Sequence, residues 1–280
     1  AATGEEKNLK TLFDYTIDRH YPNIKNSKTP ALDLLKIVME KQIKLVTDWM
    51  RIGFIHGVMN TDNMAISGET IDYGPCAFMD TYDPETVFSS IDHQGRYAYF
   101  NQPGITKWNL ARFTETLLPL IEKNKDKAVE VATETINKFD EMFNKNWLEM
   151  MKKKLGLFGE QKEDEKLISF LLSLMHIHKA DYTNTFCSLM NLGIQKDKMF
   201  NSKEFVDWHQ KWKKRLTENN HSSEESLKLM RSANPLVIPR NHKVEEALEA
   251  ANNDDLNPMK NLLKVLEKPY ENQEGISKYQ

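Results

Sequence analysis

Apolar residues recur three and four positions apart over most of the chain, which is the spacing that gives an α-helix one apolar face. The clearest case begins at Pro30 and runs to about Ile52, and proline is favoured at the first position of a helix. Its apolar face comprises Leu34, Ile37, Val38, Leu45, Trp49 and Ile52, with one polar gap. A shorter stretch with the same spacing precedes it and is broken by the sequence His-Tyr-Pro at residues 20–22.

Helical spacing returns at about Thr106 and continues almost to the end of the chain. We predict a helix from Thr106 whose apolar face includes Leu110, Phe113, Leu117 and Ile121. A longer helix follows from roughly Lys125 to Leu155, where Gly156 ends it. Further helices are predicted at about 163–178, 182–191, 202–218, 224–232, 243–251 and 255–266.

The stretch 53–75 interrupts this pattern. Two short β-prone pieces, MAI at 64–66 and TIDYG at 70–74, are separated by Ser67, Gly68 and Glu69. A Ser-Gly pair between two such pieces predicts a tight β-hairpin. Residues 75–104 have no clear periodicity and are punctuated by proline and glycine, so we expect an ordered loop there.

The predicted architecture is mainly α-helical with one small β-hairpin, in a single domain over residues 1–280. The composition, 40% hydrophobic and 28% charged, is ordinary for a globular protein. A net charge of −3 gives no sign of a nucleic-acid or acidic-membrane partner, and the apolar runs are too short to span a bilayer. Two cysteines outside any Cys-x-x-Cys motif fit a reducing compartment. No signal peptide opens the chain. Since it starts at Ala1 in place of Met and ends in ENQEGISKYQ, we expect it to be a piece of a longer protein.

Oxygen-bearing side chains are concentrated around the predicted hairpin. Asn63 and Asp72 are nine positions apart, and a hairpin between them brings them together. Magnesium prefers one or two protein oxygens together with phosphate oxygens, so this pair suits a metal–nucleotide site. Asp62 adds a carboxylate that can act as a general base, and Gly57 and Gly74 permit a close backbone approach or a positive φ. A helix-to-hairpin corner whose Asp and Asn side chains cap turns explains the same spacing, so both interpretations stay open.

The order of these residues follows the protein-kinase pattern of a His, a metal-binding Asn and an Asp-Phe-Gly. His56 takes the first position, Asn63 the second, and Asp72 opens the sequence Asp-Tyr-Gly. Val58 stands where the catalytic aspartate is expected, and Asp62 is the nearest replacement.

Longer segments resemble the selenoprotein O (YdiU) family: HGVMNTDNM, TIDYGP, DHQGRYAYFNQP, DYTNTF and SANPLVIPRN. The resemblance implies a protein-kinase-like fold and an adenylyltransferase that moves AMP from ATP to hydroxyl side chains of proteins. It implies that Asp62 is the proton acceptor, that Asn63 and Asp72 bind Mg²⁺ or Mn²⁺, and that Asp72 lies next to the phosphates of ATP, which binds in a flipped orientation relative to kinases. It further implies that this chain is the C-terminal lobe, with extra C-terminal helices and without the N-terminal lobe. Members are cytoplasmic in bacteria and mitochondrial in eukaryotes.

A catalytically silent, pseudokinase-like interaction module is the alternative, favoured by Val58 and by the missing lobe. For the remaining polar or reactive residues we expect structural roles. These are a hydrogen-bonding network at residues 92–97, a backbone contact for His56, core positions for Cys76 and Cys187, and packing for Trp108 and Asn109. Arg240 and Asn241 are within reach of a partner, with no further argument for one.

Overall fold

The computed structural model describes residues 4–190 and 198–280. It is mainly helical, with one two-stranded antiparallel sheet in the described part of the chain. The helices are α1 (Glu6–His20), α2 (Pro30–Arg51), α3 (Gln102–Ile121), α4 (Lys125–Ile136), α5 (Phe139–Lys154), α6 (Asp164–His178), α7 (Tyr182–Leu189), α8 (Lys203–Thr217), α9 (Ser223–Ala233), α10 (Asn241–Asn252) and α11 (Asn257–Leu266). Short 3₁₀ helices occur at η1 (Pro22–Ile24), η2 (Thr61–Asn63), η3 (Tyr99–Asn101), η4 (Lys198–Asn201) and η5 (Ile276–Tyr279).

The described chain divides into two compact units, and the division falls inside α2 and α5. Unit 1 comprises the described residues of 1–47, 58–74 and 101–146, and unit 2 comprises those of 48–57, 75–100 and 147–280. No described helix is long and apolar enough to cross a membrane.

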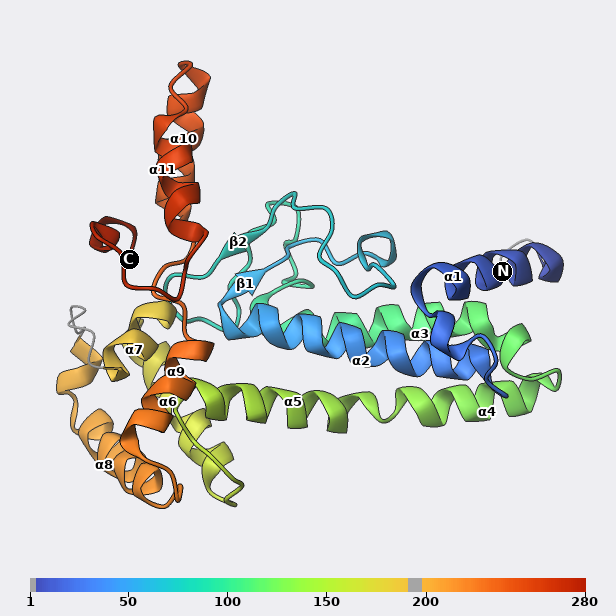
Figure 1. Ribbon diagram of the computed structural model, residues 1–280, viewed down its shortest axis with the longest axis horizontal. Coiled ribbons are helices and arrows are strands. Elements are labelled where there is room, and N and C mark those ends of the chain that lie inside the picture. Colours follow the sequence, from blue (N-terminus) through green and yellow to red (C-terminus); the bar gives the residue numbers. More distant parts are fainter. Residues whose placement is uncertain (1–3, 191–197) are drawn as a thin grey trace. The chain divides into compact units, whose positions relative to one another are not determined.

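Unit 1 is built around α2, α3 and α4. Figure 1 shows α3 and α4 as antiparallel neighbours joined by a short connection at residues 122–124. Their core also takes in α1 and the first residue of α5, and its buried members include Phe13, Ile17, Leu35, Val38, Met39, Leu110, Leu117 and Phe139. The helix predicted from Pro30 is confirmed almost to the residue.

Two details of the predicted helices were wrong. The helix predicted from Thr106 begins four residues earlier, at Gln102, with Pro103 in its first turn. The single helix predicted from Lys125 to Leu155 is two helices that meet at residues 137–138. Ile136 and Phe139 flank this break and are both buried in the core of unit 1. The sequence hides the break because it contains neither glycine nor proline there.

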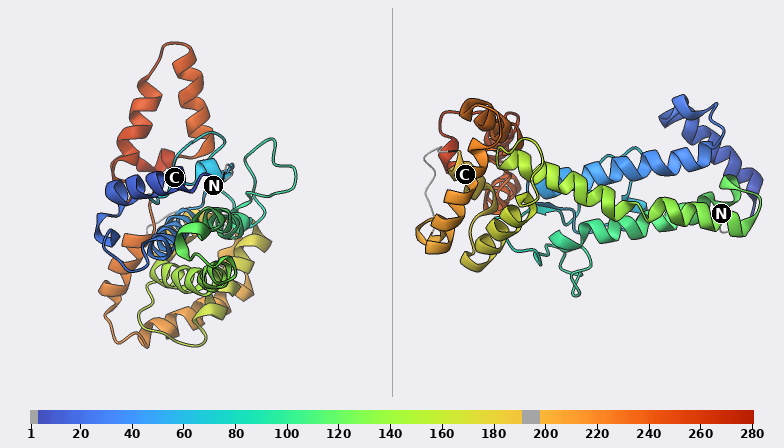
Figure 2. Two further views of the ribbon diagram at one scale, coloured as in Figure 1. Left: turned by 90° about the vertical axis from the view of Figure 1, so that its right-hand side faces the viewer. Right: turned by 90° about the horizontal axis from the view of Figure 1, so that it is seen from below.

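Unit 2 contains the sheet and the helices from α6 onward. Strand β1 (Phe54–Ile55) pairs with β2 (Ala77–Phe78), with Phe54 opposite Phe78 and Ile55 opposite Ala77. Trp208 and Trp212 stack on α8, and their indole N–H groups donate to the carbonyl oxygens of Leu167 and Leu155. The later predicted helices agree within two residues with α6 to α11, except that the predicted end at residue 191 lies outside the described residues. Helices α10 and α11 form an antiparallel pair, which is seen side by side in Figure 2.

Candidate functional site

The polar cluster lies in the connection between β1 and β2, which we call the site loop (residues 56–76). Asp62 and Asn63 occupy η2, and the next residue, Met64, forms an isolated antiparallel bridge with Thr70. Between them the chain turns back on itself: Gly68 has a φ of +77° and donates its N–H to the carbonyl oxygen of Ala65 at 3.0 Å. The predicted turn is therefore present, but it carries a single bridge in place of two strands.

The bridge determines where the three candidate residues lie. Asp62 and Asn63 directly precede one bridging residue, and Asp72 follows the other by two positions. The structure thus brings all three to the open end of one small hairpin within unit 1. Asp62 and Asp72 are exposed and Asn63 is half-buried. Convergence of their oxygens on one ion stays a prediction.

Asp72 has a backbone conformation that is uncommon for a residue other than glycine. Its φ is +55°, in the left-handed region, which aspartate tolerates better than most residues. Such conformations cost about 1–3 kcal/mol and cluster at functional sites. Of the two glycines expected to have special geometry, Gly57 does, with a φ of +83° and the carbonyl oxygen of Pro75 only 2.9 Å from where a Cβ would lie. Gly74 does not: its φ is not positive, and the nearest atom to such a Cβ is 3.6 Å away.

The side chain of Asn63 is oriented by the loop itself. Its Nδ2 donates to the carbonyl oxygen of Val58 at 3.0 Å. Because a carbonyl oxygen can only accept, the amide nitrogen must face Val58, and the amide oxygen is left for another partner. Asn63 therefore presents the atom that a hard cation prefers.

Side chains from three other segments hold the backbone of the site loop, and we call them the loop clamp. Asn109 of α3 donates to the carbonyl oxygen of Met59 at 2.8 Å, and Gln42 of α2 donates to that of Ala65 at 2.5 Å. The Tyr21 hydroxyl and the Lys41 ammonium bind the next two carbonyls, those of Ile66 and Ser67. The hairpin is thereby fixed to its surroundings on both sides of η2.

Comparisons with known proteins identify the family to which this chain belongs. The family model described as protein adenylyltransferase SelO matches residues 1–267. This chain belongs to the SelO family. A protein named protein nucleotidyltransferase YdiU from Pelagibacter ubique (strain HTCC1062) is 58% identical over 270 residues, which is 96% of this chain and 56% of that protein. Proteins of the same name from Nitrosococcus oceani and Clostridium beijerinckii are each 54% identical over 280 residues, covering all of this chain and 57% of each relative.

The chain therefore spans a little over half the length of the SelO-family relatives that it matches. The resemblance seen in the sequence is confirmed as family membership. One of the segments that carry the resemblance, HGVMNTDNM, contains Met59, whose carbonyl oxygen the loop clamp binds.

The sequence of this SelO-family member did not predict the loop clamp, because Asn109 was expected to serve in packing. Asn109 is indeed buried, with 4% of its surface exposed, but its amide binds the loop. Gln42, 2% exposed, is a polar residue on the buried side of α2. The polar gap in an otherwise apolar helix face was the signal, because a buried amide needs a hydrogen-bond partner.

His56 is buried in unit 2 and packs against the ring of Trp49, with the ring centroids 5.3 Å apart. Its expected backbone hydrogen bond stays a prediction. The expected network at residues 92–97 is confirmed: the two carboxylate oxygens of Asp92 accept from the backbone N–H groups of Arg96 and Tyr97, each at 2.8 Å. Asp92 thus stabilises the loop to which it belongs.

Arg240 forms a buried ion pair with two carboxylates of unit 2. Its guanidinium binds Asp80 at 2.7 Å and Asp181 at 2.6 Å, and its neighbour Asn241 donates to the carbonyl oxygen of Phe78 at 3.2 Å. These contacts tie the start of α10 to β2 and α7. Burial raises the pKa of the Cys187 thiol to about 12, which suits the core position predicted for it.

The donor set fits a hard cation. Among residues 4–190 and 198–280, no group of three or more His, Cys, Asp and Glu side chains is arranged to hold a metal by itself. Asn63 and Asp72 offer an amide oxygen and a carboxylate, the kind of ligand that magnesium uses together with water and phosphate oxygens. Soft metals such as zinc favour Cys and His ligands, so these two side chains fit a hard divalent cation better, and the metal itself stays a prediction.

Proposed function

We propose that the site loop is the catalytic loop and metal-binding hairpin of a protein adenylyltransferase with a protein-kinase-like fold. The enzyme transfers AMP from ATP to Ser, Thr or Tyr hydroxyl groups of other proteins, in the bacterial cytoplasm. The observation that carries this proposal is the placement of Asp62, Asn63 and Asp72 at the open end of one clamped hairpin. The description of the matching family and the names of the relatives support it.

A kinase-like arrangement is supported by the order of elements around the loop. A long helix, α2, leads into β1 and the site loop, and η2 and the hairpin are followed by Asp72-Tyr73-Gly74. The ordered loop and α3 come next, and Asn109 of α3 returns to bind the site loop. Each element of the kinase metal-binding signature except the catalytic aspartate has a counterpart in this order.

The proposed reaction is an in-line displacement at the α-phosphorus of ATP, and each candidate residue has a separate role in it. The hydroxyl oxygen of the substrate forms a bond to this phosphorus while the bond to the β-phosphate oxygen breaks, and pyrophosphate leaves. Asp62, exposed on η2, accepts the hydroxyl proton. Asn63 and Asp72 would hold the divalent cation, which neutralises charge on the phosphates when bound. The clamp contributes by fixing these side chains before the substrate arrives.

The test is transfer of label from ATP to protein by the full-length enzyme, with Mg²⁺ or Mn²⁺ present. We expect label from [α-³²P]ATP, but not from [γ-³²P]ATP, to enter protein. Asp72→Asn and Asp62→Asn should each lower transfer by about 100-fold or more, in the range of general acid–base and charge-stabilising groups. Glu69→Gln is the matched control, because Glu69 is an exposed carboxylate of the same hairpin with no proposed role.

A non-catalytic interaction module is the second candidate, and the side chain at position 58 favours it. Val58 has an aliphatic side chain where a kinase has a carboxylate, and its backbone carbonyl accepts from Asn63. Absence of α-label transfer by the folded full-length protein would support this module. Transfer of γ-label would instead identify a kinase.

A further inference from the structure

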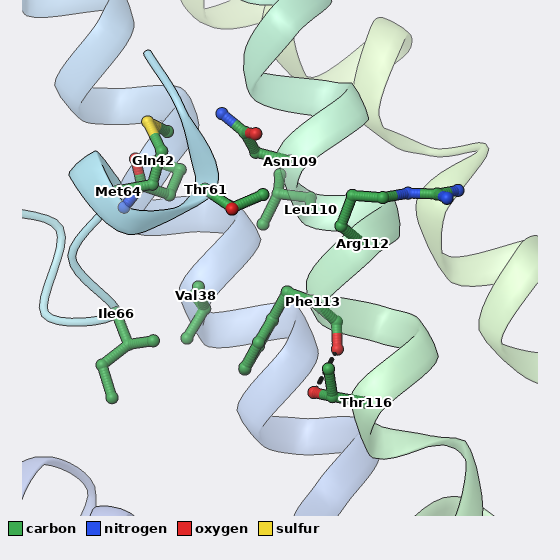
Figure 3. A pocket seen from close by; sticks show the side chains of 10 residues that line it. All are labelled: Val38, Gln42, Thr61, Met64, Ile66, Asn109, Leu110, Arg112, Phe113 and Thr116. Atoms are coloured by element: carbon green, nitrogen blue, oxygen red, sulfur yellow. Dashed lines mark hydrogen bonds between the residues drawn. The ribbon is translucent and has the colours of Figure 1, made fainter. Parts of the chain in front are cut away.

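Unit 1 contains a pocket of about 360 Å³ beside the site loop. Figure 3 shows that its walls come from α2, from the loop and from α3. The residues that line it are Val38, Gln42, Thr61, Met64, Ile66, Asn109, Leu110, Arg112, Phe113 and Thr116. Its volume is near the lower limit for small-molecule sites, which suits a compound with a single ring better than a nucleotide.

Two of the residues that line this pocket carry a buried acceptor without a partner among the described residues. The side-chain amide nitrogens of Gln42 and Asn109 donate to the carbonyl oxygens of Ala65 and Met59, respectively. Their amide oxygens, Oε1 and Oδ1, are buried and accept no hydrogen bond. Because buried acceptors are nearly always satisfied in folded proteins, this pair can take a donor from outside the chain, either a water molecule or a ligand.

The charged groups that line the pocket limit the classes of ligand that it can bind. Among the described residues that line it, Arg112 alone is charged. Its guanidinium binds Glu115 at 2.7 Å and lies over the ring of Trp108, 5.3 Å from the centroid. The pocket therefore provides neither a carboxylate for a cation nor an uncommitted cation for a phosphate, and most of its lining is apolar.

We propose that this pocket binds an uncharged aromatic molecule that carries a hydrogen-bond donor, of the primary carboxamide class. The ring lies against the apolar wall formed by residues such as Leu110 and Phe113, and the amide N–H groups donate to Gln42 and Asn109. The proposal does not depend on the adenylyltransferase function. It assigns a second role to the two clamp amides, which join the ligand to the site loop.

The position of the pocket links its occupancy to the candidate site. Thr61 and Met64 line the pocket, and they directly flank Asp62 and Asn63. A bound carboxamide stabilises the folded unit through the usual linkage between binding and folding. It also orders the segment that carries the candidate catalytic residues.

Benzamide is the probe for this site, and N,N-dimethylbenzamide and benzoate are its controls. The first control keeps the ring and removes the N–H donors, and the second adds a charge. Binding to the full-length protein is measured by saturation-transfer NMR and by perturbation of the Gln42 and Asn109 side-chain amide signals. We expect saturable binding of benzamide and binding of both controls that is weaker by about tenfold or more.

Two variants locate the binding. Thr116→Trp fills the pocket from its partly exposed wall and should abolish binding of benzamide. Val129→Trp adds the same side chain at an exposed position of α4 outside the pocket and should leave binding unchanged. The amide-signal measurement on the wild-type protein decides the matter if Thr116→Trp does not fold. Equal binding of benzamide and its dimethyl analogue, no saturable binding, or unperturbed Gln42 and Asn109 signals would each overturn the proposal, as would a crystal structure with only water on the two amide oxygens.

Discussion

The amide nitrogen of Asn109 lies 2.8 Å from the carbonyl oxygen of Met59, a residue 50 positions earlier in the chain. Both residues are buried. A side chain in the first half of α3 thus satisfies a backbone group of the site loop just ahead of η2. Because an unpaired buried carbonyl is costly, this bond selects one conformation of the loop over its alternatives.

Replacing Asn109 with alanine should therefore loosen the site loop. Loss of the donor leaves the Met59 carbonyl without its partner, and we expect the free energy of unfolding to fall by about 1–3 kcal/mol. Hydrogen–deuterium exchange of the amides at residues 58–65 should become faster. Thr114→Ala is the control, since Thr114 is buried on the same helix and its hydroxyl donates to the carbonyl oxygen of Leu110, within the helix itself. Unchanged exchange in the loop of Asn109→Ala would contradict a positioning role.

Two glycines should respond to alanine in opposite directions. At Gly57 a Cβ would lie 2.9 Å from the carbonyl oxygen of Pro75, and the φ of +83° is unfavourable for alanine. Gly57→Ala should lower the free energy of unfolding by more than about 1 kcal/mol. Gly104 lies in the first turn of α3, and apart from its chain neighbours and the backbone of its own helix, no described atom comes within 4 Å of the position that its Cβ would take. Gly104→Ala should raise stability by up to about 1 kcal/mol, and urea unfolding of both variants checks the pair.

The pH dependence of stability should contain a contribution from Lys154. Burial lowers the pKa of its ammonium well below the ordinary 10.5, and the charge of Arg51 lowers this pKa further. The Nζ donates to the carbonyl oxygen of Arg51 at 2.7 Å and lies over the ring of Phe186. Between the lowered pKa and 10.5 the unfolded chain binds the proton and the folded protein does not. Stability should therefore rise with pH across this window.

Lys154→Met removes the titrating group, so it should reduce this rise in the free energy of unfolding with pH. Lys153→Met is the matched control, because Lys153 precedes Lys154 on the same helix and is exposed. The measurement is urea unfolding at a series of pH values between neutral and about 10. An equal slope in Lys154→Met and the wild-type protein would show that Lys154 keeps its proton in the fold.

Local patterns predicted most of the helices and the turn of the hairpin. The Pro30 start of α2 and the positive φ at Gly57 follow from the properties of single residues and their neighbours. The sheet between β1 and β2 could not be predicted in the same way. Its strands are two residues each and are separated by the whole site loop, so their pairing depends on contacts distant in sequence.

The candidate site shows the same division. The types and order of Asp62, Asn63 and Asp72 are visible in the sequence, and so is the turn between their segments. The hydrogen bonds that hold the loop are not visible in the sequence, because Gln42 and Asn109 contact the loop only after α2 and α3 have packed. A buried amide on an apolar helix face indicates that some partner exists, but the partner is decided by tertiary structure.

Binding of Mn²⁺ in the presence of a non-hydrolysable ATP analogue tests the central claim most directly, since Mn²⁺ can be followed by electron paramagnetic resonance. The full-length protein should bind the ion together with the nucleotide, and Asp72→Asn and Asn63→Leu should each weaken this binding by at least about tenfold. Glu69→Gln, on the same hairpin, should bind as the wild-type protein does. Equal binding by Asp72→Asn, Asn63→Leu and the wild-type protein would contradict a metal–nucleotide site at this loop.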